Sequence, residues 1–277
     1  MSTQNALLTI LVEKINNDTL VLPTLPAIAL KVRKAADDPN VNLQGLAEVV
    51  GQDPSLSARL VKIANSAYLG RTVKVSSTSQ AVTRIGLAQV KNISTALAME
   101  QLFVSKNEVV KAYMASHWNK TVDMVANAMA AMLLYKTSNK DNSLSLDTMT
   151  LSALVADIGA LPVLTEAERH DSVFANSSFL DVAIDKLSGR IGGSIMREWQ
   201  FNEIFIEAAE HWRDTEYQES SIGYLDFIRV GAALTNNIDD AEAVLNTAIE
   251  RGLFADLDVF ESDEFTELRD NAKAIFA

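Results

Sequence analysis

Apolar residues recur along nearly the whole chain at the three- and four-residue spacing of an amphipathic helix. After Pro54, for example, Leu56, Leu60, Ile63 and Ala67 fall on one helical face. Alternation of period two is scarce, and no Asn-Gly or Asp-Gly hairpin signal occurs. With 11 glycines and 5 prolines in 277 residues, breaks between elements are few. The pattern predicts an all-α fold.

Capping residues mark several helix starts in the first half. Asn42 is placed to cap one short helix, and Asp53 to cap the next, with Pro54 at the first helical position. Ser79 is expected to cap a further short helix that Gly86 ends, and residues 87–103 are expected to continue as a helix.

The second half starts with a long predicted helix over residues 110–135, followed by a polar loop. An apolar run, SALVADIGALPVL at residues 152–164, predicts another helix, which carries one aspartate. Further helices are predicted over residues 179–198, 202–213, 218–236 and 239–251. The acidic tail is either a final helix packed on the body or a partly mobile segment.

The residue composition and the charge of the chain change near residues 105–110. This change predicts two domains, residues 1–108 and 109–277. Residues 1–110 carry 11 Lys and Arg against 8 Asp and Glu, whereas residues 111–277 carry 13 against 28. The formal net charge is −12. Because phosphates attract basic surfaces, this acidic second half predicts no binding to nucleic acid.

Cysteine is absent, which excludes disulfides, thiolate metal sites and cysteine nucleophiles and fits a reducing cytoplasm. The first residues lack the basic start of a signal peptide. No stretch is expected to reach the roughly 20 apolar residues that span a bilayer, and residues 124–135 come closest. The chain is therefore predicted to be cytoplasmic and not membrane-bound.

Three separated motifs resemble the HDOD domain, the "HD-related output domain" of bacterial signalling proteins. They are LPTLP at residues 22–26, QDPSLSARLVKIANS at residues 52–66 and QAVTRIGL at residues 80–87. The resemblance covers residues 20–215. It implies an all-α fold in which a helical N-terminal subdomain precedes a bundle similar to the HD and HD-GYP metal-dependent phosphohydrolases.

Those phosphohydrolases hold divalent metal through scattered His and Asp residues, including an adjacent His-Asp pair. On that pattern the pair falls on Ala156 and Asp157. Two further histidine positions fall on Lys120 and Ser188, and the last falls on His211. The resemblance therefore leaves only Asp157 and His211 as vestigial ligands. Since ligand number decides metal sites, the sequence predicts no metal, no other cofactor and no catalytic residue.

Asp157 without a metal would be a buried charge that needs another cation. Lys120 is expected to pair with it inside the bundle, with His211 nearby. The alternative is that Lys120 extends to solvent from an amphipathic helix. His117 could enter the site only if the register is wrong by three residues, and His170 is expected to be exposed in a charged loop.

Two weaker candidates for binding remain. Arg59, Lys62 and Arg84 either form a small basic face for an anion or partner, or are ordinary surface charges. Trp212, beside His211, either lines a ligand pocket or packs in the core. The glycine-rich stretch at residues 189–194 lacks the strand and Lys-Ser/Thr of a nucleotide loop, which favours close helix packing.

Two functions are consistent with these features. The first is a non-catalytic regulatory module of bacterial signal transduction that binds a protein partner or a small signal molecule, at the interface of its two subdomains. The second is a weak metal-dependent phosphohydrolase acting on nucleotides or cyclic dinucleotides. The incomplete ligand set favours the first.

Overall fold

The computed structural model describes residues 3–17, 19–66, 69, 73–140, 143–169 and 177–276, and every regular element among them is helical. The all-α prediction is therefore confirmed. The helices of the first half are α1 (Thr3–Asn16), α2 (Ala27–Asp37), α3 (Leu43–Val50), α4 (Pro54–Ala64), α5 (Thr78–Ile85) and α6 (Leu87–Ala98). A 3₁₀ turn, η2 (Met99–Leu102), follows.

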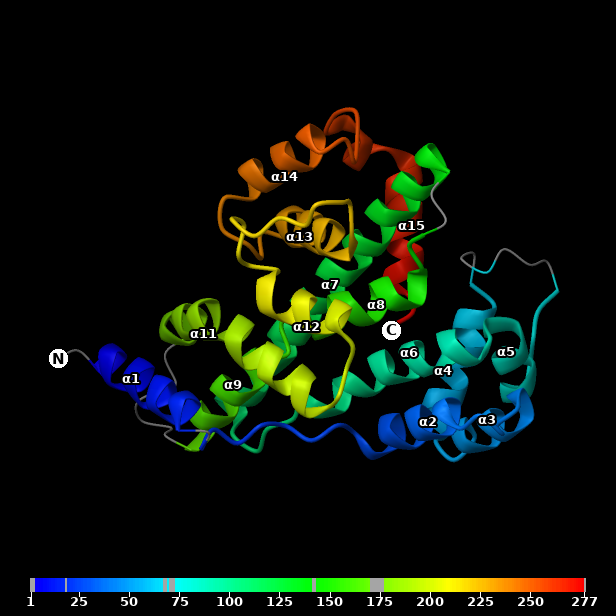
Figure 1. Ribbon diagram of the computed structural model, residues 1–277, viewed down its shortest axis with the longest axis horizontal. Coiled ribbons are helices and arrows are strands. Elements are labelled where there is room, and N and C mark those ends of the chain that lie inside the picture. Colours follow the sequence, from blue (N-terminus) through cyan, green and yellow to red (C-terminus); the bar gives the residue numbers. More distant parts are fainter. Residues whose placement is uncertain are drawn as a thin grey trace.

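The second half is larger and contains the longest helix. Its elements are α7 (Glu108–Asn139), α8 (Leu146–Val155), α9 (Ala160–Arg169), α11 (Ser177–Glu198), α12 (Glu203–His211), α13 (Tyr224–Leu234), α14 (Ala241–Glu250), η3 (Asp258–Glu261) and α15 (Asp263–Lys273). Helix α7 packs against α8, α13 and α15, so it forms the axis of the bundle (Figure 1). Residues 124–132 of α7 are all buried, as expected for a helix covered on several sides.

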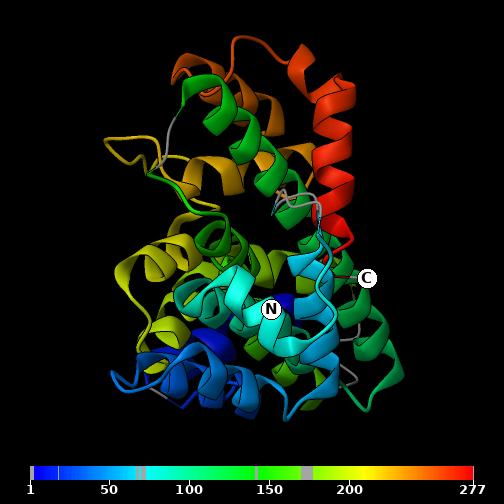
Figure 2. The same cartoon turned by 90° about the vertical axis from the view of Figure 1, so that its right-hand side faces the viewer.

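Helices α2 to α6 form a separate layer at the lower right of Figure 1. Within it α2 packs on α3 and α6, and α5 packs on α3 and α4. Helix α6 also packs on α8, which joins this layer to the bundle. In Figure 2 this layer, in blue and cyan, faces the viewer in the lower part, and α15, in red, runs along the upper right.

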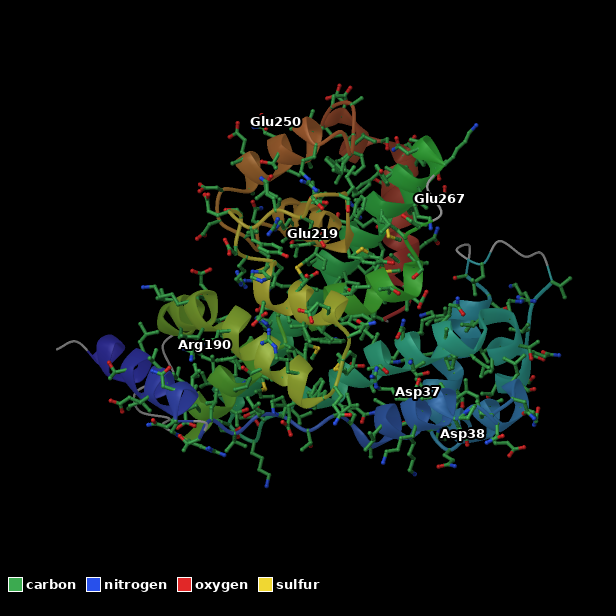
Figure 3. All side chains as sticks on the ribbon, viewed as in Figure 1. Asp37, Asp38, Arg190, Glu219, Glu250 and Glu267 are labelled. Carbon is green, nitrogen blue, oxygen red and sulfur yellow. The ribbon has the colours of Figure 1, made fainter. Side chains whose placement is uncertain are left out.

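The first helix does not lie with the layer that follows it in sequence. Helix α1 lies beside α11, where Asn16 accepts a hydrogen bond from Arg190 at 3.0 Å (Arg190 is labelled in Figure 3). Lys14 of α1 also pairs with Glu166 of α9. Further along, Trp199 donates its indole N–H to the carbonyl of Pro23 at 3.0 Å. The proposed boundary at residues 108–109 coincides with the start of α7, but the chain before α2 packs on the second half.

The predicted caps are mostly confirmed. Asn42 accepts a hydrogen bond from the backbone of Gly45, and Asp53 accepts one from Leu56 at 3.0 Å, with Pro54 opening α4. The prediction for α5 was wrong by two residues, because Ser77 rather than Ser79 accepts the capping bond. Gly86 ends α5 with a φ of 97°, a conformation that disfavours other residues.

The apolar run at residues 152–164 is not one continuous helix. Helix α8 ends at Val155 and α9 begins at Ala160, so Asp157 lies in the turn between them. A Cβ atom on Gly159 would lie 1.9 Å from the carbonyl oxygen of Ser188, which shows how closely this turn approaches α11. The absence of a side chain at this position permits the contact.

Two expectations about apolar and acidic segments can also be compared with the structure. The acidic tail forms α15, which packs on α7. The segment from Leu146 to Arg169 is long and apolar enough to cross a membrane, contrary to the expectation that no stretch would be. However, 89% of an apolar 18-residue window within this segment is buried inside the protein. Acidic side chains such as Glu219, Glu250 and Glu267 lie on the upper part of the molecule in Figure 3.

Candidate functional site

Asp157 is the centre of a buried polar cluster. Its side chain is almost fully buried, in the turn between α8 and α9. Ala156 and Ser188, beside it in sequence and on α11 respectively, are fully buried as well. A carboxylate at such a position is costly unless charged and polar groups face it.

Arg213 supplies the positive charge. Its Nη2 lies 3.1 Å from Asp157 Oδ2, and its Nη1 donates to the carbonyl of Asn237 at 3.2 Å and lies 3.7 Å from Asp185 Oδ1. The guanidinium also lies over the ring of Trp212, 4.0 Å from the centroid. These contacts hold the guanidinium firmly against the buried carboxylate.

His117 contacts the same carboxylate oxygen from α7. Its Nε2 lies 3.2 Å from Asp157 Oδ2, and the imidazole is 8% exposed. Phe103 and Tyr113, which both precede His117 in the sequence, stack on the imidazole ring with centroid distances of 6.1 Å and 6.3 Å. The ring is therefore fixed in orientation by packing.

The balance of these interactions keeps Asp157 ionised. Burial is the strongest influence and raises the pKa, but the charge of Arg213, the contacts with His117 and the hydroxyl of Ser188 together lower the pKa below the ordinary aspartate value. The pKa of neighbouring Tyr113 is raised, first by burial and then by its hydrogen bond to Asp181. The cluster thus contains a compensated anion rather than a neutral acid.

Several atoms of the cluster still lack a well-aligned hydrogen bond. Among the described residues these include Asp157 Oδ1, His117 Nε2, Ser188 Oγ and Arg213 Nε. Ser188 therefore faces Asp157 closely enough to lower its pKa but forms no hydrogen bond of good geometry with it. The cluster is electrostatically balanced but not saturated with hydrogen bonds.

The cluster does not fit the divalent metal that the HD and HD-GYP phosphohydrolases hold. No group of three or more His, Asp or Glu side chains converges anywhere in the described ranges. At Asp157 only one imidazole joins the carboxylate, and the permanently charged Arg213 contacts the oxygen Oδ2. A guanidinium at this distance repels a cation from the carboxylate that would bind it.

A cleft of about 460 Å³ lies next to the cluster. Its walls come from α7, α11 and the segments after α12 and α13. They include Tyr113, Ser116, His117, Lys120, Asp181, Asp185, Lys186, Arg213, Asn237 and Asp239. Both signs of charge and two side-chain amides, those of Asn236 and Asn237, line the cleft, and its size is within the range of small-molecule sites.

The prediction that Lys120 pairs with Asp157 is wrong. Lys120 is exposed at the wall of the cleft, and the side chains that contact Asp157 are those of Arg213 and His117. His117 lies three residues before Lys120, nearly one helical turn, and it is the residue that faces inward. The expected register on α7 was therefore shifted by three residues, and the outward alternative holds for Lys120.

His211 is not part of the cluster. It is 30% exposed, stacks on Tyr217 with ring centroids 3.9 Å apart, and lies 3.8 Å from Asp214. Trp212 is fully buried and packs in the core rather than lining a ligand pocket. The expectation that His211 lies near Asp157 is thus wrong, and the residue of this segment that contacts Asp157 is Arg213. His170 lies outside the described residues.

The small basic face in the first half is largely used internally. Arg59 pairs with Glu100 at 2.6 Å, and Arg84 donates to the carbonyls of Ala64 and Val73. Lys62 is exposed on α4. Two of the three cations therefore stabilise the fold, which favours the alternative of ordinary structural and surface charge.

Sequence reasoning missed Arg213 because its contact spans 56 residues. One signal was available, since the segment His211–Trp212–Arg213 puts a cation two residues after a proposed ligand position. A buried aspartate that has lost its metal needs a cation, so every Lys and Arg near the vestigial positions is a candidate partner for it.

Two solved structures share the fold of this chain. A crystal structure from Shewanella amazonensis SB2B, described as "Putative metal-dependent phosphohydrolase", is 39% identical over 100% of both chains with a TM-score of 0.94. A Marinobacter aquaeolei VT8 structure, described as "Putative signal transduction protein", is 21% identical, with a TM-score of 0.64. This match covers 99% of this chain and 66% of the other, and at this identity it supports the fold alone.

A curated relative from Treponema pallidum (strain Nichols), described as "Uncharacterized protein", is 28% identical over 99 residues. That match covers 36% of this chain and only 18% of the relative. The family model described as "HDOD domain" matches residues 22–215, which include all three motifs, Asp157 and Arg213. This chain therefore belongs to the HDOD domain family.

Proposed function

We propose that this HDOD protein is a regulatory module of bacterial signal transduction that works by binding a protein partner or a small signal molecule, and that it is not an enzyme. The observation that carries the proposal is the Arg213 guanidinium 3.1 Å from the buried Asp157 carboxylate. A phosphohydrolase of this architecture would need a divalent cation at that carboxylate to activate water. The resident cation already neutralises Asp157.

The cleft beside the cluster supports the binding part of the proposal. It has room for a small molecule, and two of its cations, Lys120 and Lys186, form no ion pair among the described residues. Its amides, hydroxyls and carboxylates would give such a ligand specific polar contacts. The proposal places the protein in the cytoplasm, with no membrane or nucleic-acid partner.

A weak metal-dependent phosphohydrolase is the second candidate. It is favoured by the buried atoms Asp157 Oδ1 and His117 Nε2, which have no well-aligned hydrogen bond and are of types that bind metal. The description of the 39% identical Shewanella amazonensis protein points the same way. Two such ligands beside a guanidinium are too few for a tightly held catalytic ion.

Metal content and activity distinguish the two candidates. Protein purified without chelator is analysed for metal and then assayed with manganese against a phosphodiester such as bis(p-nitrophenyl) phosphate. The regulatory proposal expects well under about 0.1 metal ion per chain and the same background rate for wild type and Asp157→Asn. Stoichiometric metal, together with hydrolysis that Asp157→Asn abolishes, would establish the phosphohydrolase instead.

A further inference from the structure

A second cavity lies between the α2–α6 layer and the α7–α8 part of the bundle. Its volume is about 230 Å³, and none of its lining residues is shared with the cleft beside Asp157. Ile93 and Leu97 of α6 line one side, and Met129 and Leu146 of the bundle line the other. Ile275, near the end of the chain, also lines it. In Figure 1 the C-terminus accordingly lies near α6 and α8.

One wall of this apolar cavity carries a carboxylate. Asp147, in the first turn of α8, is 8% exposed and lines the cavity. Its Oδ2 accepts a hydrogen bond from the side-chain amide of Asn92 at 2.8 Å. No Lys, Arg or His of the described residues forms an ion pair with Asp147, unlike Asp157.

The surroundings of Asp147 stabilise its charge only in part. The N-terminal end of α8 and the Asn92 amide provide partial positive charge, which makes the carboxylate tolerable without a ligand. Full compensation for a charge at this depth needs a cation with hydrogen-bond donors. The apolar walls mean that such a cation must arrive on a molecule with a hydrophobic body.

We propose that the cavity between α6 and α8 binds a small apolar molecule ending in a primary ammonium group, with the ammonium on Asp147. An apolar cavity of about 150 Å³ accepts benzene, so the larger volume here suits an aromatic ring with a short alkylamine chain. Because the ligand contacts α6 and α8 together, its binding would change how the two halves are held. The regulatory meaning of this site rests on the proposed function, but the binding itself does not.

Three probes with one hydrophobic body test the site: 2-phenylethylamine, 2-phenylethanol and 3-phenylpropanoate. Binding is followed by NMR of isoleucine methyl groups, because Ile63, Ile85, Ile93 and Ile275 all line the cavity. The amine is expected to bind about tenfold more tightly than the alcohol, and the carboxylate more weakly than both. The methyl shifts are expected at these four isoleucines.

Two variants separate the charge from the cavity. Asp147→Asn keeps the shape and is expected to reduce the preference for the amine over the alcohol to within about twofold. Ala96→Met, which extends into the cavity from α6, is expected to abolish binding of all three probes, with the fold checked by circular dichroism. Should Asp147→Asn fail to fold, the wild-type order of amine, alcohol and carboxylate tests the charge, and the loss of amine binding in Ala96→Met tests the cavity.

Asp239→Asn, at the wall of the other cleft, is the matched control and is expected to leave amine binding unchanged. Absence of binding, an amine preference that persists in Asp147→Asn, or binding that only Asp239→Asn removes would each overturn the proposal. None of these results depends on metal content or hydrolysis. Failure here is therefore distinguishable from failure of the proposed function.

Discussion

Replacement of Arg213 by methionine tests whether its guanidinium compensates the buried Asp157. The substitution keeps much of the side-chain length but removes the charge. It deletes the contact with Asp157 Oδ2 at 3.1 Å, the hydrogen bond to the Asn237 carbonyl at 3.2 Å and the cation–π contact with Trp212. His117, 3.2 Å from the same oxygen, would remain as the nearest partner of the carboxylate.

The loss of unfolding free energy in Arg213→Met is expected to be large because Asp157 is only 2% exposed. Breaking a buried ion pair by removing one partner costs about 3–5 kcal/mol of unfolding free energy. In the double variant Asp157→Asn/Arg213→Met the carboxylate charge is gone too, and about 2–3 kcal/mol is expected to return. The single variant should therefore be less stable than the double variant.

Urea denaturation followed by far-ultraviolet circular dichroism measures these free energies for wild type, both single variants and the double variant. Arg197→Met is the control, since its bidentate pair with Glu210 at 2.8 Å and 2.7 Å is half exposed and should cost about 1 kcal/mol or less. If the two single effects add to within about 0.5 kcal/mol, Arg213 and Asp157 are not coupled and the reasoning is refuted.

Three further predictions concern stability. Gly159→Ala would place a Cβ 1.9 Å from the Ser188 carbonyl oxygen and should destabilise the protein by about 4 kcal/mol or prevent folding. Gly45→Ala in α3 should instead stabilise the protein by about 0.5–1 kcal/mol. Equal melting temperatures of these two variants would contradict the prediction. Because the pKa of Asp157 is lowered on folding, its stabilisation is present above about pH 4 and is lost as the pH falls through the folded-state pKa. As the pH falls from about 6 to 3, the unfolding free energy of Asp157→Asn should therefore decrease less than that of wild type. Parallel plots of unfolding free energy against pH for the two proteins would exclude this role of Asp157. Asp53→Ala removes the cap of α4 and should cost about 1 kcal/mol in urea denaturation, an expectation that fails if Ser55→Ala costs as much.

At the candidate site, the sequence predicted the buried carboxylate of Asp157 but not its partners. The three motifs identified the family because they are local, and the apolar run around Asp157 indicated a buried carboxylate. The partner of that carboxylate was predicted wrongly. His117 and Lys120 lie three residues apart on α7, so a rotation of about 60° decides which one faces inward. That rotation follows from packing of α7 against its neighbours.

The sequence by itself determined the helical class, most helix positions and the caps at Asn42 and Asp53, because periodicity and capping depend on residues a few positions apart. Only the tertiary structure decided that α1 lies against α11, that Asp157 occupies a turn, and that Arg213 faces it across 56 residues. The charge of a buried group is balanced by whatever cation the fold brings near, and sequence distance does not limit that choice.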